Sequence, residues 1–177
     1  MGPTASGKTP LAVEIVRHFP CEIVSVDSAM VYREMDIGTA KPDLATLQKA
    51  PHRLINLVDP KEAYSAGQFC LDVLREIEDI VARGKIPLLV GGTMLYFRVL
   101  QQGLATLPRA DKLLRSELQS QAQQQGWEAL HAVLAGVDPQ AAKRISVHDS
   151  QRITRALEVY QLTGKTITAW QADDTQP

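Results

Sequence analysis

Short continuous apolar runs recur along the first hundred residues. They occupy residues 22–26, 54–58 and 86–90 and predict buried β-strands, the second run more weakly than the other two. The stretch 28–52 shows little periodicity and contains glycine and proline, so we expect it to be mostly loop. Strands that are apolar on both sides are typical of a parallel sheet covered by helices on both faces.

The segments between these runs carry helical spacing. A first helix follows residue 9, because apolar residues three and four apart share one face: Leu11, Ala12, Ile15 and Val16. A second helix is predicted from the capping residue Ser65 to about Arg83, with Gly84 at its C-terminal end. A third runs from about Met94 to Gln101. This order predicts an α/β fold with a parallel sheet.

The pattern changes near Pro108, and from there to Gly164 no strand is predicted. Four helices are predicted instead, the third of them short and following Pro139. The fourth is capped by Asp149 or Ser150 and closed by Gly164. The inward-facing residues of the three longer helices are Leu113, Leu114, Leu118 and Ala122; Trp127, Leu130, Val133 and Leu134; and Ile153, Ala156, Leu157 and Tyr160. We therefore predict an α/β core over 1–107 and an all-helical inserted lobe over 108–177.

Composition narrows the classes of protein. The 177 residues are 45% hydrophobic, enough for a packed core, and the formal net charge is −1, so nucleic-acid binding would need a local basic patch. The two cysteines, Cys21 and Cys70, form no CxxC pair, which argues against a disulfide framework and fits a reducing cytoplasm. No apolar run approaches the roughly 20 residues that span a bilayer.

A complete phosphate-loop motif stands at the start of the chain. It matches G-x-x-x-x-G-K-[ST] and consists of Gly2, Pro3, Thr4, Ala5, Ser6, Gly7, Lys8 and Thr9. Its amides and the following helix N-terminus would surround phosphate oxygens, Lys8 would add charge, and the Thr9 hydroxyl could ligate Mg²⁺. The motif indicates a P-loop NTPase-like core that binds a phosphate chain, without specifying ATP. Only Met1 precedes it and the last residues are polar, so we expect a fragment at both ends.

Two further residues follow predicted strands. Asp27 ends the run 22–26, and Thr93 follows Gly91 and Gly92 after the run 86–90. Since ligands bind at the carboxyl ends of parallel strands, both side chains should face the phosphates. Asp27 could then be a metal ligand, a general base or only a turn cap, and Thr93 could also cap a helix. The histidines, His52 among them, lack metal-site spacing and are interpreted as structural or surface groups.

At this point the chain resembles the tRNA dimethylallyltransferase (isopentenyltransferase) family, most closely its bacterial branch. The similar motifs run in the family's order from residue 2 to about 165 and include, beside the phosphate loop, segments 25–29, 35–42, 51–54, 64–66, 87–96 and 151–158 together with Tyr32. The resemblance covers about the first half of the family's length. It implies transfer of a dimethylallyl group from its diphosphate to N6 of the adenosine 3′ of the anticodon in tRNA.

The resemblance also implies roles for residues. Asp27 is similar to the family's catalytic base, Thr93 to a hydroxyl near the reacting centre, and Thr9 would hold Mg²⁺. The tRNA contacts implied are Asp27, Ser28, Ala29, Met30, Thr93, Arg115, Gln151, Arg152, Ile153, Thr154 and Arg155. Residues 141–165 carry five basic and two acidic side chains, a local charge of +3, which suits RNA but also fits a solvated helix face. We expect a cytoplasmic monomer without membrane attachment whose partners are tRNA and dimethylallyl diphosphate.

Two other functions share these motifs. A prenyltransferase acting on free adenine nucleotides would use the same loop and base but would not need a basic helical lobe. A small-molecule kinase would use ATP as donor, with Asp27 as the base for a substrate hydroxyl.

Overall fold

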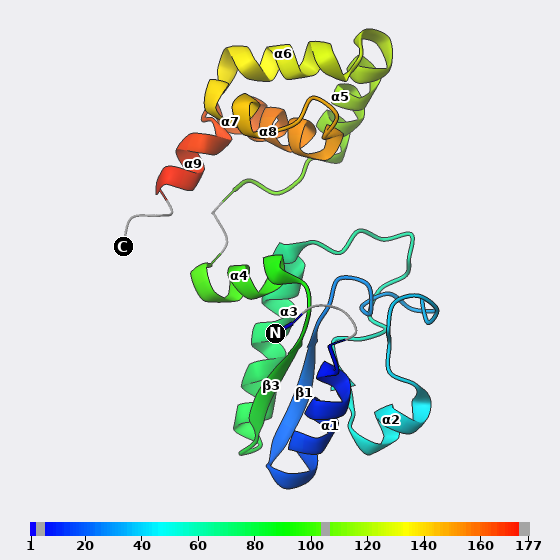
Figure 1. Ribbon diagram of the computed structural model, residues 1–177. Helices are drawn as coiled ribbons and strands as arrows, with labels where there is room; N and C mark the ends of the chain where they lie inside the picture. Colours follow the sequence, from blue (N-terminus) through cyan, green and yellow to red (C-terminus); the bar gives the residue numbers. More distant parts are fainter. Residues whose placement is uncertain (3–5, 104–106, 174–177) are drawn as a thin grey trace. The chain divides into compact units, whose positions relative to one another are not determined.

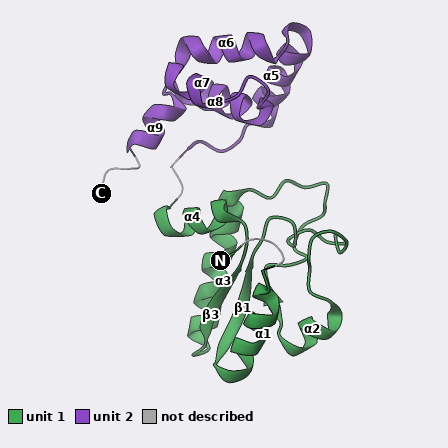
Figure 2. Cartoon of the chain, in the orientation of Figure 1, with its two compact units in different colours: residues 1–103 green, residues 104–177 purple. Residues whose placement is uncertain are grey.

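The computed structural model describes residues 1–2, 6–103 and 107–173. The chain forms two compact units, residues 1–103 and 104–177, each with its own core (Figure 2). The division falls between residues 103 and 104, whereas the sequence led us to expect it at 107/108. No helix in the described ranges is both long enough and apolar enough to cross a membrane.

The described part of unit 1 contains a parallel sheet in the order β2-β1-β3 (Figure 1). The central strand β1 spans Cys21–Val26 and pairs along its length with β3, Ile86–Gly91, so that Val26 lies opposite Gly91. The short strand β2, His52–Arg53, pairs with the other edge of β1, His52 opposite Ile23. Two of the predicted strands, at 22–26 and 86–90, are thus confirmed.

Helices cover both faces of this sheet. On one face, Val24 and Val26 pack against α3, Ala66–Ala82, and α4, Met94–Gln102. The rings of Phe69 and Tyr96 stack at 4.1 Å between the centroids and join these two helices. On the other face, Ile23 packs with Ala12 of α1, Lys8–His18. A short helix α2, Leu44–Lys49, precedes β2.

The residues at the two ends of α3 act as the sequence predicts. The Ser65 hydroxyl accepts a hydrogen bond from the Gln68 amide at 3.1 Å, which satisfies one of the amides at the helix start. Past the other end, Gly84 adopts φ +71°, a conformation that glycine takes at little cost. The α3 boundaries are therefore set by residues next to them in sequence.

The strand predicted at 54–58 is wrong. Leu54 and Asn56 adopt positive φ of 61° and 55°, which no strand contains, and the paired residues are His52 and Arg53. The segment instead pairs with the loop after β1: the Asn56 amide donates to the Met30 carbonyl at 3.1 Å, and Val58 forms one isolated bridge with Tyr32. A long-range loop contact, invisible in the apolar pattern, overrides the local strand preference.

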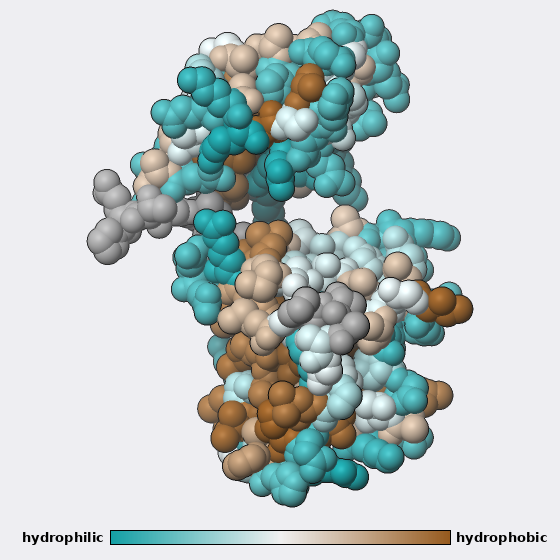
Figure 3. Space-filling view, in the orientation of Figure 1, coloured by the Kyte–Doolittle hydropathy of each residue, from teal (hydrophilic) through white to brown (hydrophobic). Residues whose placement is uncertain are grey.

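The strand β3 is less buried than its apolar sequence suggested. Its residues 87–90 are only half-buried, and Ile86 is exposed, because β3 is an edge strand of the sheet in the described residues. Apolar side chains gather over β3 and the neighbouring α3 (Figure 3). Exposed apolar residues of α3 are Leu71, Leu74 and Val81.

The described residues 107–173 of unit 2 form helices and connecting loops without a strand, as expected. Its helices are α5, Lys112–Gln125; α6, Trp127–Val137; α7, Pro139–Arg144; α8, Ser150–Thr163; and α9, Ile167–Asp173. Their core includes Leu118, Leu130, Leu134, Ile153 and Leu157. The Asp149 carboxylate caps α8 by accepting from the Arg152 amide at 3.1 Å, and Gly164 closes it in a left-handed conformation.

Some predicted inward-facing residues point outward. Leu11, Leu113 and Val133 are 63%, 78% and 55% exposed, so the helical stripes are narrower than the apolar pattern indicated. Helix α9 was not predicted, because its anchoring is tertiary. Buried Asp138 accepts hydrogen bonds from the Thr168 hydroxyl at 2.8 Å and the Thr168 amide at 3.1 Å.

Candidate functional site

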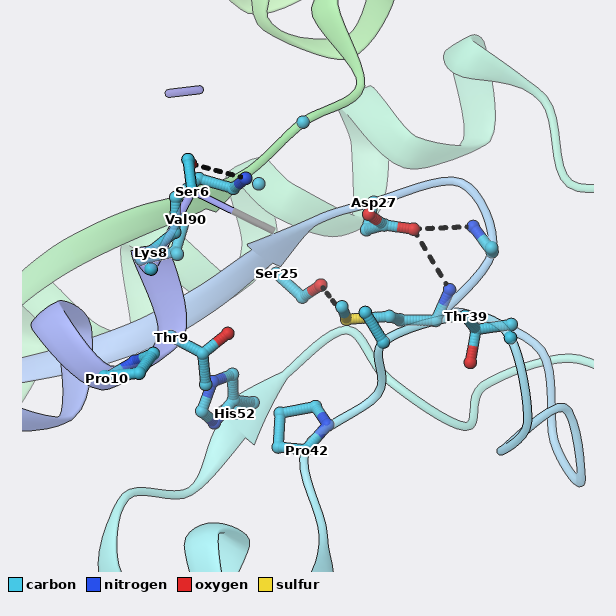
Figure 4. A pocket seen from close by; sticks show the side chains of 17 residues that line it. Ser6, Lys8, Thr9, Pro10, Ser25, Asp27, Thr39, Pro42, His52 and Val90 are labelled. Atoms are coloured by element: carbon cyan, nitrogen blue, oxygen red, sulfur yellow. Dashed lines mark hydrogen bonds between the residues drawn. The ribbon is translucent and has the colours of Figure 1, made fainter. Parts of the chain in front are cut away.

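A pocket of about 440 Å³ opens at the carboxyl ends of β1 and β3, beside the start of α1 (Figure 4). Four parts of the chain meet there: the phosphate-loop motif with α1, the end of β1 with the turn and loop after it, the start of β2, and the end of β3. The residues lining it include Gly7, Lys8, Thr9, Asp27, Met30, Thr39, His52, Gly91 and Gly92. The sheet thus brings together the motif, Asp27 and the glycines at the end of β3, as predicted from the strand ends, whereas Thr93 is not among the residues that line the pocket.

The motif turns directly into a helix. Gly7 adopts φ +76° at the N-cap of α1, and Lys8 and Thr9 occupy its first turn. The Lys8 ammonium donates to the Ser6 hydroxyl at 3.4 Å, beside the helix start. The α1 N-terminus presents amide dipoles to the pocket, an environment that favours an anion. Pro3, Thr4 and Ala5, predicted phosphate contacts, lie outside the described residues.

Asp27 is held by the turn that follows it. Its Oδ1 accepts hydrogen bonds from the Ala29 amide at 2.9 Å and the Met30 amide at 3.3 Å (Figure 4). The turn-cap role is therefore present, but it uses one carboxylate oxygen. Oδ2 receives no hydrogen bond from any described residue, so it can accept a proton or a ligand. Ala29 and Met30 also line the pocket, whereas Ser28 does not.

Thr93 acts across the sheet rather than as a helix cap. It occupies the N-cap position of α4, yet its side chain bonds no helix amide. Its Oγ1 accepts from the Ser28 amide at 3.0 Å and lies 3.3 Å from the Ser28 hydroxyl, while its own amide donates to the Val26 carbonyl at 3.2 Å. Thr93 thereby positions the turn that carries Asp27.

The loop after β1 is held by a buried lysine. The Lys41 side chain is 3% exposed, and its ammonium donates to the Tyr32 carbonyl, Asp36 and Asn56 at 2.7–2.8 Å. Thr39 donates to the Met35 carbonyl at 2.7 Å. The sequence assigned these residues no role, and in the structure they shape the loop that lines one side of the pocket.

His52 is a pocket residue that the sequence analysis took for structural. It lines the cavity from β2, and its Nδ1 lies 2.7 Å from the Ala50 carbonyl. Burial lowers the pKa of His52 and favours the neutral ring. The family-like segment 51–54 contains this position, but the sequence analysis assigned it no role, because only the pairing of β2 with β1 brings it to the pocket.

The oxygen donors of the pocket suit a magnesium ion that is shared with a ligand. The described residues contain no cluster of three or more His, Cys, Asp or Glu side chains that would make an all-protein metal cage. Mg²⁺ is commonly bound by one or two protein oxygens plus phosphate oxygens and water. The Thr9 hydroxyl, in the pocket wall at the start of α1, would be one such protein oxygen.

In unit 2, two of the predicted tRNA-contacting arginines form an ion-pair cluster around Glu158. The Glu158 side chain is fully buried and accepts from Arg115 at 2.8 and 2.9 Å, from Arg155 at 2.7 Å and from the Asp111 amide at 2.8 Å. Burial alone would raise the pKa of Glu158, but these hydrogen bonds lower it. Arg155 also donates to the Pro108 carbonyl at 2.8 Å, so its guanidinium is largely engaged within the unit.

The remaining predicted tRNA contacts differ in access. Arg152 is 73% exposed and pairs only loosely with Asp149 at 3.2 Å, and Gln151 is also exposed. Thr154 is half-buried. Ile153 lies fully buried in the helical core, which leaves its side chain no access to RNA. Of the predicted tRNA contacts on α8, Gln151 and Arg152 are therefore the exposed ones.

Comparison with known proteins shows which family the chain belongs to. A family model described as IPP transferase matches residues 30–177, from the pocket loop through both units. The chain belongs to the IPP transferase family. It is 63% identical over 169 residues to the tRNA dimethylallyltransferase of Nitrosomonas eutropha, a match that covers 96% of this chain and 53% of that protein. This member of the family thus spans about half the length of the curated relatives it matches.

Solved structures of IPP transferases agree with this. The full-length tRNA isopentenylpyrophosphate transferase of Bacillus halodurans is 41% identical, with a TM-score of 0.58 over 93% of this chain and 55% of that one. A eukaryotic dimethylallyltransferase, solved acting on tRNA, is 30% identical, with a TM-score of 0.77 over 99% of this chain and 43% of that one.

Proposed function

We propose that this IPP transferase moves a dimethylallyl group from dimethylallyl diphosphate to N6 of the adenosine 3′ of the anticodon in tRNA. The observation that carries the proposal is one pocket lined by both the phosphate-loop motif and Asp27. The parallel sheet and the motif before α1 support a P-loop NTPase-like core. A phosphate-holding turn and a carboxylate in one cavity suit a reaction that releases diphosphate while a nucleophile loses a proton.

The diphosphate would lie against the α1 N-terminus. Amides of the first turn and the Lys8 ammonium stabilise the charge that develops on the leaving group. Thr9 would hold Mg²⁺, which would supply additional charge neutralisation when bound. The bond between the allylic carbon and the diphosphate oxygen breaks, and its electron pair leaves with the diphosphate.

The new bond forms between the allylic carbon and N6 of adenosine. The exocyclic amine must lose one proton, and Asp27 Oδ2 receives it, since Oδ1 is held by the Ala29 and Met30 amides. Thr93, through Ser28, keeps that turn in place. The adenosine must leave its stack to enter the pocket, which costs less in a loop than in a duplex. Exposed Gln151 and Arg152 are candidates for holding the tRNA backbone.

A labelling experiment on the full-length protein tests this function. Dimethylallyl diphosphate with a labelled prenyl group is supplied with undermodified tRNA or with AMP, and labelled ATP is supplied without either. Prenyl label in tRNA supports the proposal. Label in AMP would support the nucleotide prenyltransferase instead, and ATP turnover without prenyl transfer would support a kinase.

The role of Asp27 is tested by two substitutions. Asp27→Ala should abolish transfer, and Asp27→Asn, which keeps an oxygen for the Ala29 and Met30 amides but takes up no proton, should lower kcat about 10²- to 10⁴-fold. Binding of inorganic pyrophosphate, measured by calorimetry, should persist in Asp27→Asn. Turnover by Asp27→Asn at the wild-type rate would remove Asp27 from the proton transfer.

A further inference from the structure

The His52 Nε2 atom has no hydrogen-bond partner in the part of the chain that the structure describes. Among the described residues it is the buried side-chain nitrogen or oxygen left in this state. Such an atom costs free energy, and most buried polar atoms in proteins are paired, so an unpaired one in a pocket wall points to a missing partner. The residue itself lines the candidate site.

The other ring nitrogen defines which partner Nε2 needs. Nδ1 lies 2.7 Å from the Ala50 carbonyl, and a carbonyl only accepts, so Nδ1 carries the proton. In the neutral ring Nε2 then presents a bare lone pair. Pairing of His52 with Ile23 across the sheet fixes the ring at this place. The missing partner is therefore a hydrogen-bond donor.

The hydroxyl groups that line the pocket are the candidate donors to His52 Nε2. The Ser25 hydroxyl donates to the Met30 sulfur at 3.8 Å, and the Thr39 hydroxyl donates to the Met35 carbonyl at 2.7 Å. The Ser6 hydroxyl accepts from Lys8, and Figure 4 shows Ser6 on the other side of the pocket from His52. Thr9 lines the same pocket, and in Figure 4 its methyl group is on the side of the His52 ring while its hydroxyl points away from that ring. A threonine in a helix has two accessible rotamers, so its hydroxyl can turn to either side.

When the pocket holds diphosphate and Mg²⁺, the Thr9 hydroxyl needs an acceptor for its proton. A hydroxyl has one proton and two lone pairs, and a lone pair directed at a cation requires its proton to point away. We propose that His52 is a positioning residue whose Nε2 accepts the Thr9 hydroxyl proton when diphosphate binds. The Thr9 lone pairs are then held toward the ligand and its Mg²⁺. This inference rests on the proposed function only in assuming that the pocket binds diphosphate.

A double-mutant cycle in the full-length protein tests the pair. Binding of inorganic pyrophosphate with Mg²⁺ is measured by calorimetry for the wild type, Thr9→Val, His52→Leu and the double variant. His52→Leu should weaken binding about tenfold, the effect of one lost hydrogen bond. The double variant should bind no more weakly than Thr9→Val. His52→Gln, which retains an acceptor, should stay within about threefold of the wild type.

A second readout does not depend on affinity. In ¹⁵N spectra of the histidine rings, the Nε2 resonance of His52 should shift when pyrophosphate and Mg²⁺ are added to the wild type. The same addition to Thr9→Val should leave it in place, and thermal unfolding shows whether each variant is folded. Additive losses in the cycle, or an unmoved resonance in the wild type, would overturn the pairing. A wild type that binds no pyrophosphate would overturn the proposed function itself.

Discussion

Gly91 shows how one residue determines the geometry of the pocket. A Cβ built on Gly91 would lie 2.0 Å from the Val26 carbonyl oxygen, inside the backbone of the neighbouring strand. Only a hydrogen atom fits where β3 leaves the sheet beside Asp27. The glycine therefore serves strand pairing, which allows the two strand ends to carry their functional residues side by side.

Replacing Gly91 with alanine should separate the ends of β1 and β3. We expect the free energy of unfolding to fall by about 1–3 kcal/mol, as for other overpacked sites, because the backbone must move. Denaturant unfolding measures this loss. The matched control is Gly136→Ala in α6, where no atom lies within 4 Å of the added carbon, and where alanine should be neutral or stabilising. Equal stability of the two variants would contradict the strand-end argument.

At the scale of elements, the loop after β1 depends on the buried Lys41. Its ammonium reaches acceptors on both the loop and the segment after β2, so it reinforces the backbone hydrogen bonds that already join these two irregular segments. This contact explains why residues 54–58 follow the loop rather than extend the sheet.

Replacing Lys41 with methionine should loosen this loop. The change leaves the Tyr32 carbonyl and Asn56 without their donor, and we expect a loss of about 1–3 kcal/mol together with faster amide exchange over residues 29–42. Hydrogen-exchange mass spectrometry follows the amides. Lys49→Met, at an exposed lysine of α2, is the control and should leave them unchanged.

Helix α8 divides its arginines between two roles. Arg155 should stabilise unit 2, because its removal leaves buried Glu158 with one charged partner fewer; we expect Arg155→Ala to cost about 3–5 kcal/mol. Exposed Arg152 should instead contact phosphate, so Arg152→Ala should weaken tRNA binding and lower its salt dependence without loss of stability. Filter binding at several salt concentrations, beside thermal unfolding, separates the two. If Arg152→Ala left the salt dependence unchanged, the exposed face of α8 would be interpreted as a solvated helix face that does not contact tRNA.

At the scale of unit 1, a charge cluster joins the sheet to α3 at the end opposite the pocket. Glu22 of β1 accepts from Arg83 and Lys85, which lie between α3 and β3, and from Arg53 of β2. Hydrogen bonds from Arg83, then from Lys85, lower the pKa of Glu22 to about 2. The elements that build the pocket are thus held together at their far ends by one carboxylate.

This cluster predicts a defined acid sensitivity. The pKa of Glu22 is lower in the folded state than its ordinary value of 4.5, so its stabilising contribution is present above pH 4.5 and is lost as pH falls toward about 2. Glu22→Gln should be less stable than the wild type at pH 7. The difference should shrink between pH 4.5 and 2, which unfolding at a series of pH values measures. A difference that stays constant over that range would rule out the linkage.

Local sequence determined much of this molecule. Apolar runs predicted β1 and β3, Ser65 and Gly84 predicted the ends of α3, and the phosphate-loop motif with Asp27 predicted where the pocket lies. These features depend on neighbours within a few residues or on the rule that parallel strands end at one edge. The same signals could not distinguish the inward Ala12 from the outward Leu11, because exposure depends on what packs against the helix.

Tertiary structure decided the rest. The pairing of His52 with Ile23, the burial of Lys41 and the ion pairs of Glu158 join residues that lie far apart in sequence. Their partners are brought close only when the sheet and the helical core form. Periodicity records which side of one element is apolar, whereas the function of a polar side chain depends on the charges and donors that folding places beside it.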